Sequence, residues 1–252
     1  MDKGSIKDYS FYSQALDEEL NLLVYIPANY TPLNEYNILL ASDGKDYFQL
    51  GGISKVADEL INDYEIENLI IVGIPYKDAY DRKRKYIPTG DLHEAYLRFL
   101  SHELVPFLDE EFSTSQLNTN RGLIGDSMAA TVSLLAALRY QHIFGKVIMQ
   151  SPYVDEHVLK IVEETKTHEN LDIYHVIGKQ ETKVVTTDRS VKDFLTPNRK
   201  LHELLTAKNY KVFYDEFDGN HTWKYWKPDL KRALTKIFSD WFHVSLIDFW
   251  YT

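Results

Sequence analysis

The chain has 252 residues, of which 44% are hydrophobic and 26% are charged. Its formal net charge of −10 makes it a poor partner for nucleic-acid phosphates, which attract clustered Lys and Arg. It contains no cysteine, which excludes disulfides, a thiol nucleophile and Cys-ligated metal sites. We expect a single domain over residues 1–252, because no linker-like or repeated segment interrupts the sequence.

Short apolar runs alternate along the chain with longer amphipathic stretches. The apolar runs predict strands at 21–27, 36–42, 68–74, 122–125, 146–150, 172–177 and 211–216. The amphipathic stretches predict helices at 53–63, 94–111, 127–139, 156–164, 197–209 and 228–242. This alternation is typical of an α/β fold with a mostly parallel, doubly wound sheet and helices on both faces.

The first two predicted strands have no helix between them. Only residues 28–35 separate them, and Pro27 and Pro32 act there as breakers. We therefore predict that 21–27 and 36–42 pair with each other as antiparallel strands at the N-terminal side of the sheet. Ligands of doubly wound sheets bind at the carboxyl ends of the strands, so functional residues are expected in the loops that follow them.

The chain shows no sign of a targeting or membrane segment. The first residues, MDKGS, lead into polar sequence without the apolar region of a signal peptide. The longest apolar runs, such as 69–74, are far shorter than the roughly 20 residues of a membrane helix. We expect a soluble, cytoplasmic protein with no membrane partner.

The most informative motif joins a predicted strand directly to a predicted helix. Residues 125–129 read GDSMA, a G-x-S-x-A variant of the G-x-S-x-G nucleophile elbow. In such a turn the nucleophile, here Ser127, has a strained backbone, and Gly125 and Ala129 are small enough for the crowded positions around it. The start of the helix supplies N–H groups to a developing oxyanion. The alternative is that Ser127 only caps the helix.

A serine nucleophile needs a general base, and His221 is the best placed of the 9 histidines. It follows the last predicted strand in the loop sequence FDGNHTW, whereas His175 lies inside an apolar strand and is expected to be a core residue. The alternative for His221 is an exposed loop position.

Glu181 is the candidate acid that orients the histidine. It follows the predicted strand 172–177 and lies between the serine and the histidine in the chain, the order nucleophile, acid, base. Asp188 is its competitor, and Asp218 is a third possibility that we expect to form a turn. The oxyanion would be held by the N–H of Met128 and by a second donor in the loop after strand 36–42. Position alone favours the backbone of Gly44 for that second donor.

These motifs, in this order and spacing, resemble the putative esterase family of α/β-hydrolases, which includes esterase D, enterochelin esterases and feruloyl esterase domains. The similar pieces are VYIPANY (24–30), SDG (42–44), VGI (72–74), ELVP (103–106), the elbow, FG (144–145), QSP (150–152) and GNHTW (219–223). The resemblance implies an α/β-hydrolase fold and supports a triad of Ser127, Glu181 and His221. It also implies the backbone of Gly44 or Lys45 as the second oxyanion donor.

The sequence departs from the family pattern at identifiable positions. The family's G-x-S-x-G-G ends here in Ala129 and Ala130, and Asn220 stands where a second Gly is usual. The family's R-x-x-E-Y-x-P is matched at Arg82, while Lys85 replaces its acidic residue.

Three side chains are candidates for substrate contact. The resemblance implies an anion-recognising role for Arg82, although the basic run 81–85 could equally be a solvated loop. Asp43, beside the expected oxyanion loop, and Trp223, after the histidine, are the other two. Trp226 is expected to be a core residue.

We predict a serine esterase that cleaves a carboxylic ester of a small molecule through an acyl-enzyme on Ser127. The reaction needs neither a metal nor an organic cofactor. The alternatives are a non-catalytic α/β-hydrolase scaffold, and a thioesterase or acyltransferase that uses the same nucleophile. Six of the nine residues in 244–252 are apolar or aromatic. We expect this segment to pack either on its own domain or on a second copy in a homodimer.

Overall fold

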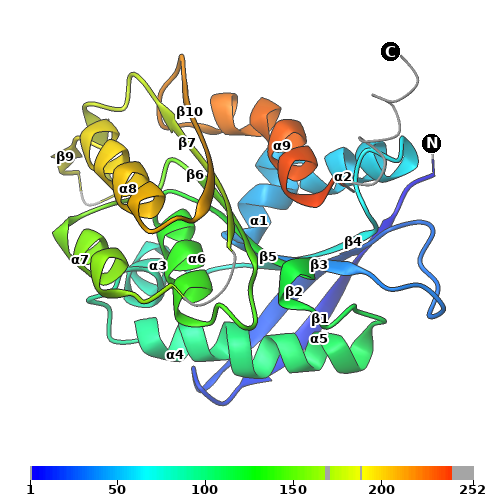
Figure 1. The fold of residues 1–252 in the computed structure, drawn as a ribbon. Coiled ribbons are helices and arrows are strands. Elements are labelled where there is room, and N and C mark those ends of the chain that lie inside the picture. Colours follow the sequence, from blue (N-terminus) through cyan, green and yellow to red (C-terminus); the bar gives the residue numbers. More distant parts are fainter. Residues whose placement is uncertain (1, 168–170, 188, 240–252) are drawn as a thin grey trace, which may run out of the picture.

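An eight-stranded sheet forms the centre of the protein in the computed structural model, which describes residues 2–167, 171–187 and 189–239 (Figure 1). The strand order is β1-β2-β4-β3-β5-β6-β7-β10. The strands are β1 Ser5–Ser13, β2 Glu18–Ile26, β3 Asn37–Ser42, β4 Leu69–Ile74, β5 Arg121–Asp126, β6 Lys146–Gln150, β7 Asp172–Gly178 and β10 Lys211–Phe217. β1 and β2 pair antiparallel, β2 pairs antiparallel with β4, and the remaining pairs are parallel.

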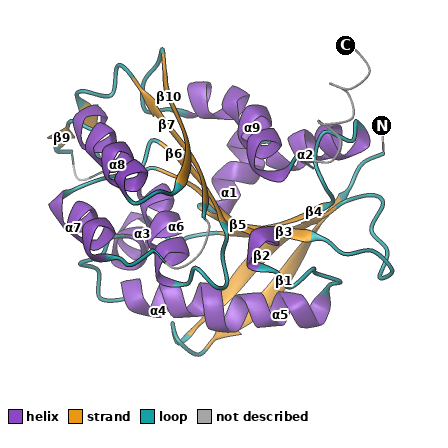
Figure 2. Ribbon diagram, viewed as in Figure 1, coloured by secondary structure: helices purple, strands orange, loops and turns teal. Residues whose placement is uncertain are grey.

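Helices cover both faces of this sheet (Figure 2). They are α1 Gly44–Asp46, α2 Ile53–Asn62, α3 Ala79–Tyr86, α4 His93–Arg98, α5 Val105–Glu111, α6 Met128–Arg139, α7 Glu156–Glu164, α8 Leu195–Ala207 and α9 Trp223–Phe238. Shorter elements are the π-helical turns η1 Tyr47–Gly51 and η2 Phe99–Leu104, the 3₁₀ turn η3 Asn118–Asn120, and a hairpin of β8 Val184–Val185 and β9 Val191–Lys192.

The central strands are mostly apolar because both of their faces are buried. In β3, Ile38 and Leu40 join a cluster that includes side chains of α4 to α8. Leu39 and Ala41 point the other way, into a cluster with α2 and α9. Successive side chains of a strand alternate between faces, so a strand covered on both sides reads as a continuous apolar run. The predicted α/β class with a mostly parallel sheet is confirmed.

The predicted direct pairing of the first two strands is wrong. β4 lies between β2 and β3, and β2 pairs instead with β1, which the sequence analysis did not predict. β1 was missed because it is an edge strand: most of its side chains are exposed, and only Ser13 is fully buried. The antiparallel N-terminal strands are therefore β1 and β2, and the segment after β2 passes across β4.

Helix α3 is a second element that the sequence analysis missed. The basic run 81–85 lies inside it, so this run is helical, not a solvated loop. Asp78 caps the helix by accepting hydrogen bonds from the N–H groups of Tyr80 and Asp81, both at 2.8 Å. α9 also begins earlier than predicted, at Trp223, with Pro228 inside it. The apolar segment 244–252 lies outside the described residues, as do the last residues of the helix predicted at 228–242.

None of the helices in the described ranges is long and apolar enough to cross a membrane.

The two-sided burial of β3 predicts a large cost for truncating its side chains. Leu40→Ala should lower the free energy of unfolding by about 2–5 kcal/mol, because it leaves a cavity in the larger cluster. Leu33→Ala is the matched control, because Leu33 is 93% exposed. It should change the free energy of unfolding by less than about 0.5 kcal/mol. Urea unfolding measures both; equal effects of the two variants would contradict this account of the core.

Candidate active site

The turn between β5 and α6 holds Ser127 in a strained conformation. Its backbone angles are φ 53° and ψ −124°, a region that residues other than glycine rarely adopt. The Ser127 N–H donates to the carbonyl of Gln150 (3.0 Å), and its own carbonyl accepts from the N–H of Thr131 (3.2 Å). Its side chain makes no capping hydrogen bond to the described first turn of α6. Ser127 therefore occupies the helix start without using its hydroxyl as a cap.

Gly125 is required for the close approach of strand and helix at this turn. A Cβ atom at Gly125 would lie 2.1 Å from the carbonyl carbon of Ala129, a distance that real Cβ atoms do not reach. Ala129 and Ala130 are both fully buried against the strand. The two alanines thus fit where the family pattern has glycines.

His221 and Glu181 form a short hydrogen bond. The Nδ1 of His221 lies 2.6 Å from Oε2 of Glu181, whose side chain is fully buried. The other carboxylate oxygen, Oε1, accepts from the hydroxyl of Ser151 (2.7 Å) and from the N–H of Gly178 (2.9 Å). Each oxygen of the buried Glu181 carboxylate therefore has a partner, as a buried carboxylate requires.

Aromatic rings fix the imidazole of His221 from two sides. The ring centroid of Phe194 lies 4.5 Å from that of His221, and the ring of Trp226 lies 4.8 Å away. The indole N–H of Trp226 donates to the hydroxyl of Ser151 (3.0 Å), which in turn bonds to Glu181. The orientation of the histidine is thus set by its carboxylate partner and by packing together.

Ser127 and His221 line one cavity of about 630 Å³ at the carboxyl ends of the strands. Ser127 follows β5, Glu181 follows β7 and His221 follows β10, three strands on the same side of the sheet. A second cavity of about 750 Å³ lies between α4, α6 and α7 and contains none of these residues. Although this second cavity is larger, it lies away from the strand ends at which Ser127, Glu181 and His221 are placed.

Neither of the other two candidates for the triad acid is seen beside His221. Asp188 lies outside the described residues, and Asp218 is exposed. Glu181 is the carboxylate that the structure brings to His221.

The predicted oxyanion donors stand at two helix starts. Met128 is the first residue of α6, and Gly44 and Lys45 are the first two of α1. The bonds inside these helices begin with the N–H groups of Thr131 and Asp46, so the earlier N–H groups are not used by the helices themselves. Their role toward an oxyanion stays a prediction.

Asp43 and Arg82 form a buried ion pair in the wall of the cavity. The Nε of Arg82 donates to both carboxylate oxygens of Asp43 (3.0 and 2.8 Å), and an Nη group donates to one of them as well. Burial acts to lower the pKa of Arg82, but the charge and hydrogen bonds of Asp43 outweigh it and raise the pKa. The guanidinium of Arg82 is therefore already paired with Asp43. Recognition of an anionic substrate by Arg82 stays a prediction.

Trp223 is not among the residues that line this cavity; its ring packs on Tyr47 (4.9 Å) and on Trp226 (5.7 Å). Trp226 is buried, as expected, but it also contributes to the cavity wall. The sequence analysis missed the contacts that Ser151 makes with Glu181 and Trp226. Ser151 lies in the QSP piece that resembles the family, so it had a positional signal.

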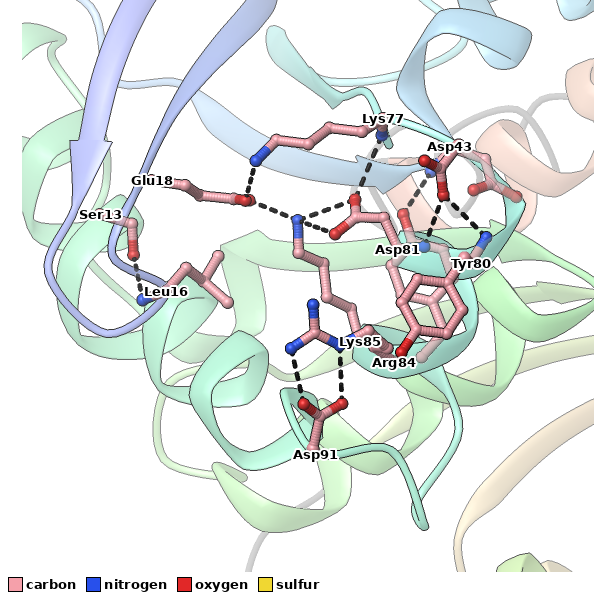
Figure 3. A network of polar contacts seen from close by, with 12 residues as sticks. Ser13, Leu16, Glu18, Asp43, Lys77, Tyr80, Asp81, Arg84, Lys85 and Asp91 are labelled. Carbon is pink, nitrogen blue, oxygen red and sulfur yellow. Dashed lines mark hydrogen bonds and ion pairs between the residues drawn. The ribbon is translucent and has the colours of Figure 1, made fainter.

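Lys85 is the centre of a buried charge cluster that holds α3 against the β1–β2 hairpin (Figure 3). Its Nζ bonds to Glu18 on β2 and lies 2.9 Å from the carboxylate of Asp81, one turn earlier in α3. The Lys85 side chain is 3% exposed, and those of its two acidic partners are each 10% exposed. The cluster explains why a lysine can replace the family's acidic residue, since two carboxylates balance its charge. It also anchors the helix that carries Arg82.

In the described part of the chain, no group of three or more His, Asp or Glu side chains is arranged to hold a metal ion.

The burial of the Lys85 cluster predicts a stability effect that a surface pair lacks. Lys85→Met should lower the free energy of unfolding by about 3–5 kcal/mol, because it leaves the carboxylate of Asp81 without a cation and that of Glu18 with the exposed Lys77 alone. The matched control is Lys160→Met, which removes an exposed pair with Glu164 and should cost less than about 0.5 kcal/mol. If urea unfolding gave the same small loss for both, the cluster would not be an anchor.

Comparison with known proteins identifies the family of this chain. A family model described as putative esterase matches residues 13–237. The chain is 49% identical over 234 residues to the uncharacterized protein YjcH of Bacillus subtilis (strain 168), which covers 93% of this chain and 98% of that protein.

Solved structures of esterases share the fold. The enterobactin esterase of Shigella flexneri, determined with enterobactin, has a TM-score of 0.80 at 19% identity, over 92% of this chain and 58% of that one. This chain thus spans little more than half of that enzyme. A ferulic acid esterase of Anaeromyces mucronatus has a TM-score of 0.71 at 18% identity, over 94% and 93% of the two chains. The family match supports ester hydrolysis in general. The chain belongs to the putative esterase family and has the α/β-hydrolase fold.

Proposed function

We propose that this protein is a serine esterase that hydrolyses a carboxylic ester of a small molecule, with Ser127 as nucleophile, His221 as general base and Glu181 as the acid that orients it. The observation that carries the proposal is the 2.6 Å contact between Nδ1 of His221 and the buried Glu181, in a cavity that His221 shares with the strained Ser127. A buried carboxylate on Nδ1 keeps that nitrogen protonated and leaves Nε2 free to accept a proton.

The reaction then proceeds in two stages, acylation of Ser127 and hydrolysis of the acyl-enzyme. His221 takes the hydroxyl proton of Ser127 as Oγ attacks the ester carbonyl, and the resulting oxyanion is held by the N–H of Met128 and of Gly44 or Lys45. The intermediate collapses to an acyl-enzyme, and His221 gives its proton to the departing alkoxide. Water, deprotonated by His221, then attacks the acyl-enzyme, and Ser127 regains its proton as the carboxylic acid leaves.

The positive potential at the start of α6 favours this chemistry. The residues of its first turn present N–H groups without helical partners, and the helix dipole adds to their attraction for a negative oxygen. The buried, fully bonded Glu181 stabilises the imidazolium that forms on His221 during each stage.

Loss of the nucleophile should remove the activity. Ser127→Ala should lower kcat/KM for p-nitrophenyl acetate by about 10³-fold or more. Ser133→Ala is the matched control. It makes the same chemical change within α6, at a residue outside the cavity, and its kcat/KM should stay within about twofold of that of the parent chain. Turnover of Ser127→Ala at the level of the control would contradict the proposal.

The acid assignment is tested by removing charge without changing shape. Glu181→Gln should lower kcat by up to about 10⁴-fold, because the amide no longer fixes the histidine tautomer. Asp188→Asn, the alternative acid by sequence, is the control and should have a far smaller effect. A larger loss in Asp188→Asn than in Glu181→Gln would show that the acid is misassigned, while leaving Ser127 as the nucleophile.

A further inference from the structure

Asp126 is a cavity-lining residue that the proposed triad does not use. It ends β5, directly before Ser127, and it is one of the residues that line the cavity shared by Ser127 and His221. Only 6% of the residue is exposed. A buried carboxyl beside a nucleophile needs either a partner or a function.

One oxygen of the Asp126 carboxyl has no hydrogen-bond partner in the described part of the protein. This oxygen, Oδ1, is buried. The nearest cation, Arg82, is committed to Asp43 and reaches only the main-chain carbonyl of Asp126, at 3.4 Å. Arg82 therefore neutralises one of the two neighbouring carboxylates and not the other.

The surroundings of Asp126 favour its protonated form. Burial, then the charge of Asp43, raise the pKa of Asp126 well above its usual range. Arg82 and a hydrogen bond from the main chain of Asp126 itself oppose the shift, and Asp46 adds to it. Tyr47 is a further titratable group that interacts with Asp126. Burial, and then the charge of Asp126, raise the pKa of Tyr47 well above its ordinary value. Burial raises the pKa of Asp43 as well, although its bonds to Arg82 oppose that shift. Of the two carboxyls beside Arg82, the one without a bond to the guanidinium therefore holds its proton to the higher pH.

We place the proton on Oδ2, the carboxyl oxygen of Asp126 that is not buried without a partner. On the buried Oδ1 it would have no acceptor, and a buried donor without an acceptor is costly. Oδ2 is the remaining polar atom of a side chain that lines the cavity. A neutral carboxyl there is a hydrogen-bond donor, not an anion.

The strand order places Asp126 on the acyl side of the reacting ester. The groups around Asp126 come from the segment after β3 and from α3, whereas His221 contacts Glu181, Phe194 and Trp226. β3 and β7 lie on opposite sides of β5 in the sheet. Because the histidine protonates the leaving alkoxide, the alcohol part of the ester lies toward His221 and the acyl part lies away from it.

Resting on the proposed esterase function, we infer that Asp126 is a specificity-determining residue that donates a hydrogen bond to an oxygen of the substrate's acyl group. The substrate class is then esters of carboxylic acids that carry an ether, hydroxyl or carbonyl oxygen close to the ester carbonyl. An acyl group with a methylene at that place leaves the buried donor unsatisfied.

A pair of isosteric substrates tests this inference. Phenyl methoxyacetate and phenyl butyrate differ by an oxygen in place of a methylene, and their kcat/KM ratio is divided by the ratio of their hydroxide-catalysed rates. The parent protein should prefer the methoxyacetate by roughly tenfold after this correction. Asp126→Asn keeps a donor and should keep the preference. Asp126→Leu removes the donor and should abolish it; if that variant does not fold, Asp126→Ala replaces it.

The pH dependence of the same ratio gives a second readout. A carboxyl with a raised pKa holds its proton up to a higher pH than an ordinary Asp and loses it above that. The preference of the parent protein should therefore fall toward alkaline pH, and that of Asp126→Asn should not. Because the ratio compares two substrates of one enzyme, pH effects that act equally on both esters cancel.

The inference is overturned by any of three results: a corrected ratio near one in the parent protein, an unchanged ratio in Asp126→Leu, or a ratio that rises with pH. These results leave the esterase function intact as long as both esters are hydrolysed and Ser127→Ala abolishes the hydrolysis. If the parent protein hydrolyses neither ester and shows no Ser127-dependent turnover of p-nitrophenyl acetate, the proposed function fails, and the inference fails with it.

Discussion

The buried carboxylate of Glu181 is the constraint on which the rest of the site depends. A fully buried charge is tolerated only when hydrogen bonds compensate it, and here Ser151, Gly178 and His221 supply them. Those bonds fix the turn after β7 relative to the loop after β10. Trp226, at the start of α9, adds a further connection through Ser151. The position of the histidine is thus a consequence of satisfying one buried group.

A second buried ionic system stabilises the opposite side of the cavity. Asp43 and Arg82 compensate each other, and Lys85 with its two acidic partners anchors the helix that carries the arginine. Asp126 lies on this same side, and its Oδ1 is bonded to neither system. The cavity therefore has a histidine side, where a leaving group would be protonated, and an arginine side, where we infer that the carboxyl of Asp126 faces the acyl group.

The parts of this arrangement that the sequence predicts are those with a local signature. The continuous apolar runs of β3 and β4 and the small residues around Ser127 identify the parallel sheet and the elbow. β1 carries no such signature, because an edge strand need not be apolar, and without it β2 is assigned the wrong neighbour. The commitment of Arg82 to Asp43 and the unpartnered carboxyl of Asp126 depend on contacts between segments distant in the chain, which no local pattern records.

The central claim is that Ser127 is an activated nucleophile, and covalent labelling tests it most directly. Incubation of the full chain with a fluorophosphonate, followed by intact-mass analysis and peptide mapping, should show a single adduct on the peptide that contains Ser127. The Glu181→Gln variant should react far more slowly, because its histidine is no longer oriented to accept the serine proton. Absence of an adduct under these conditions, or an adduct on a different residue, would contradict the account.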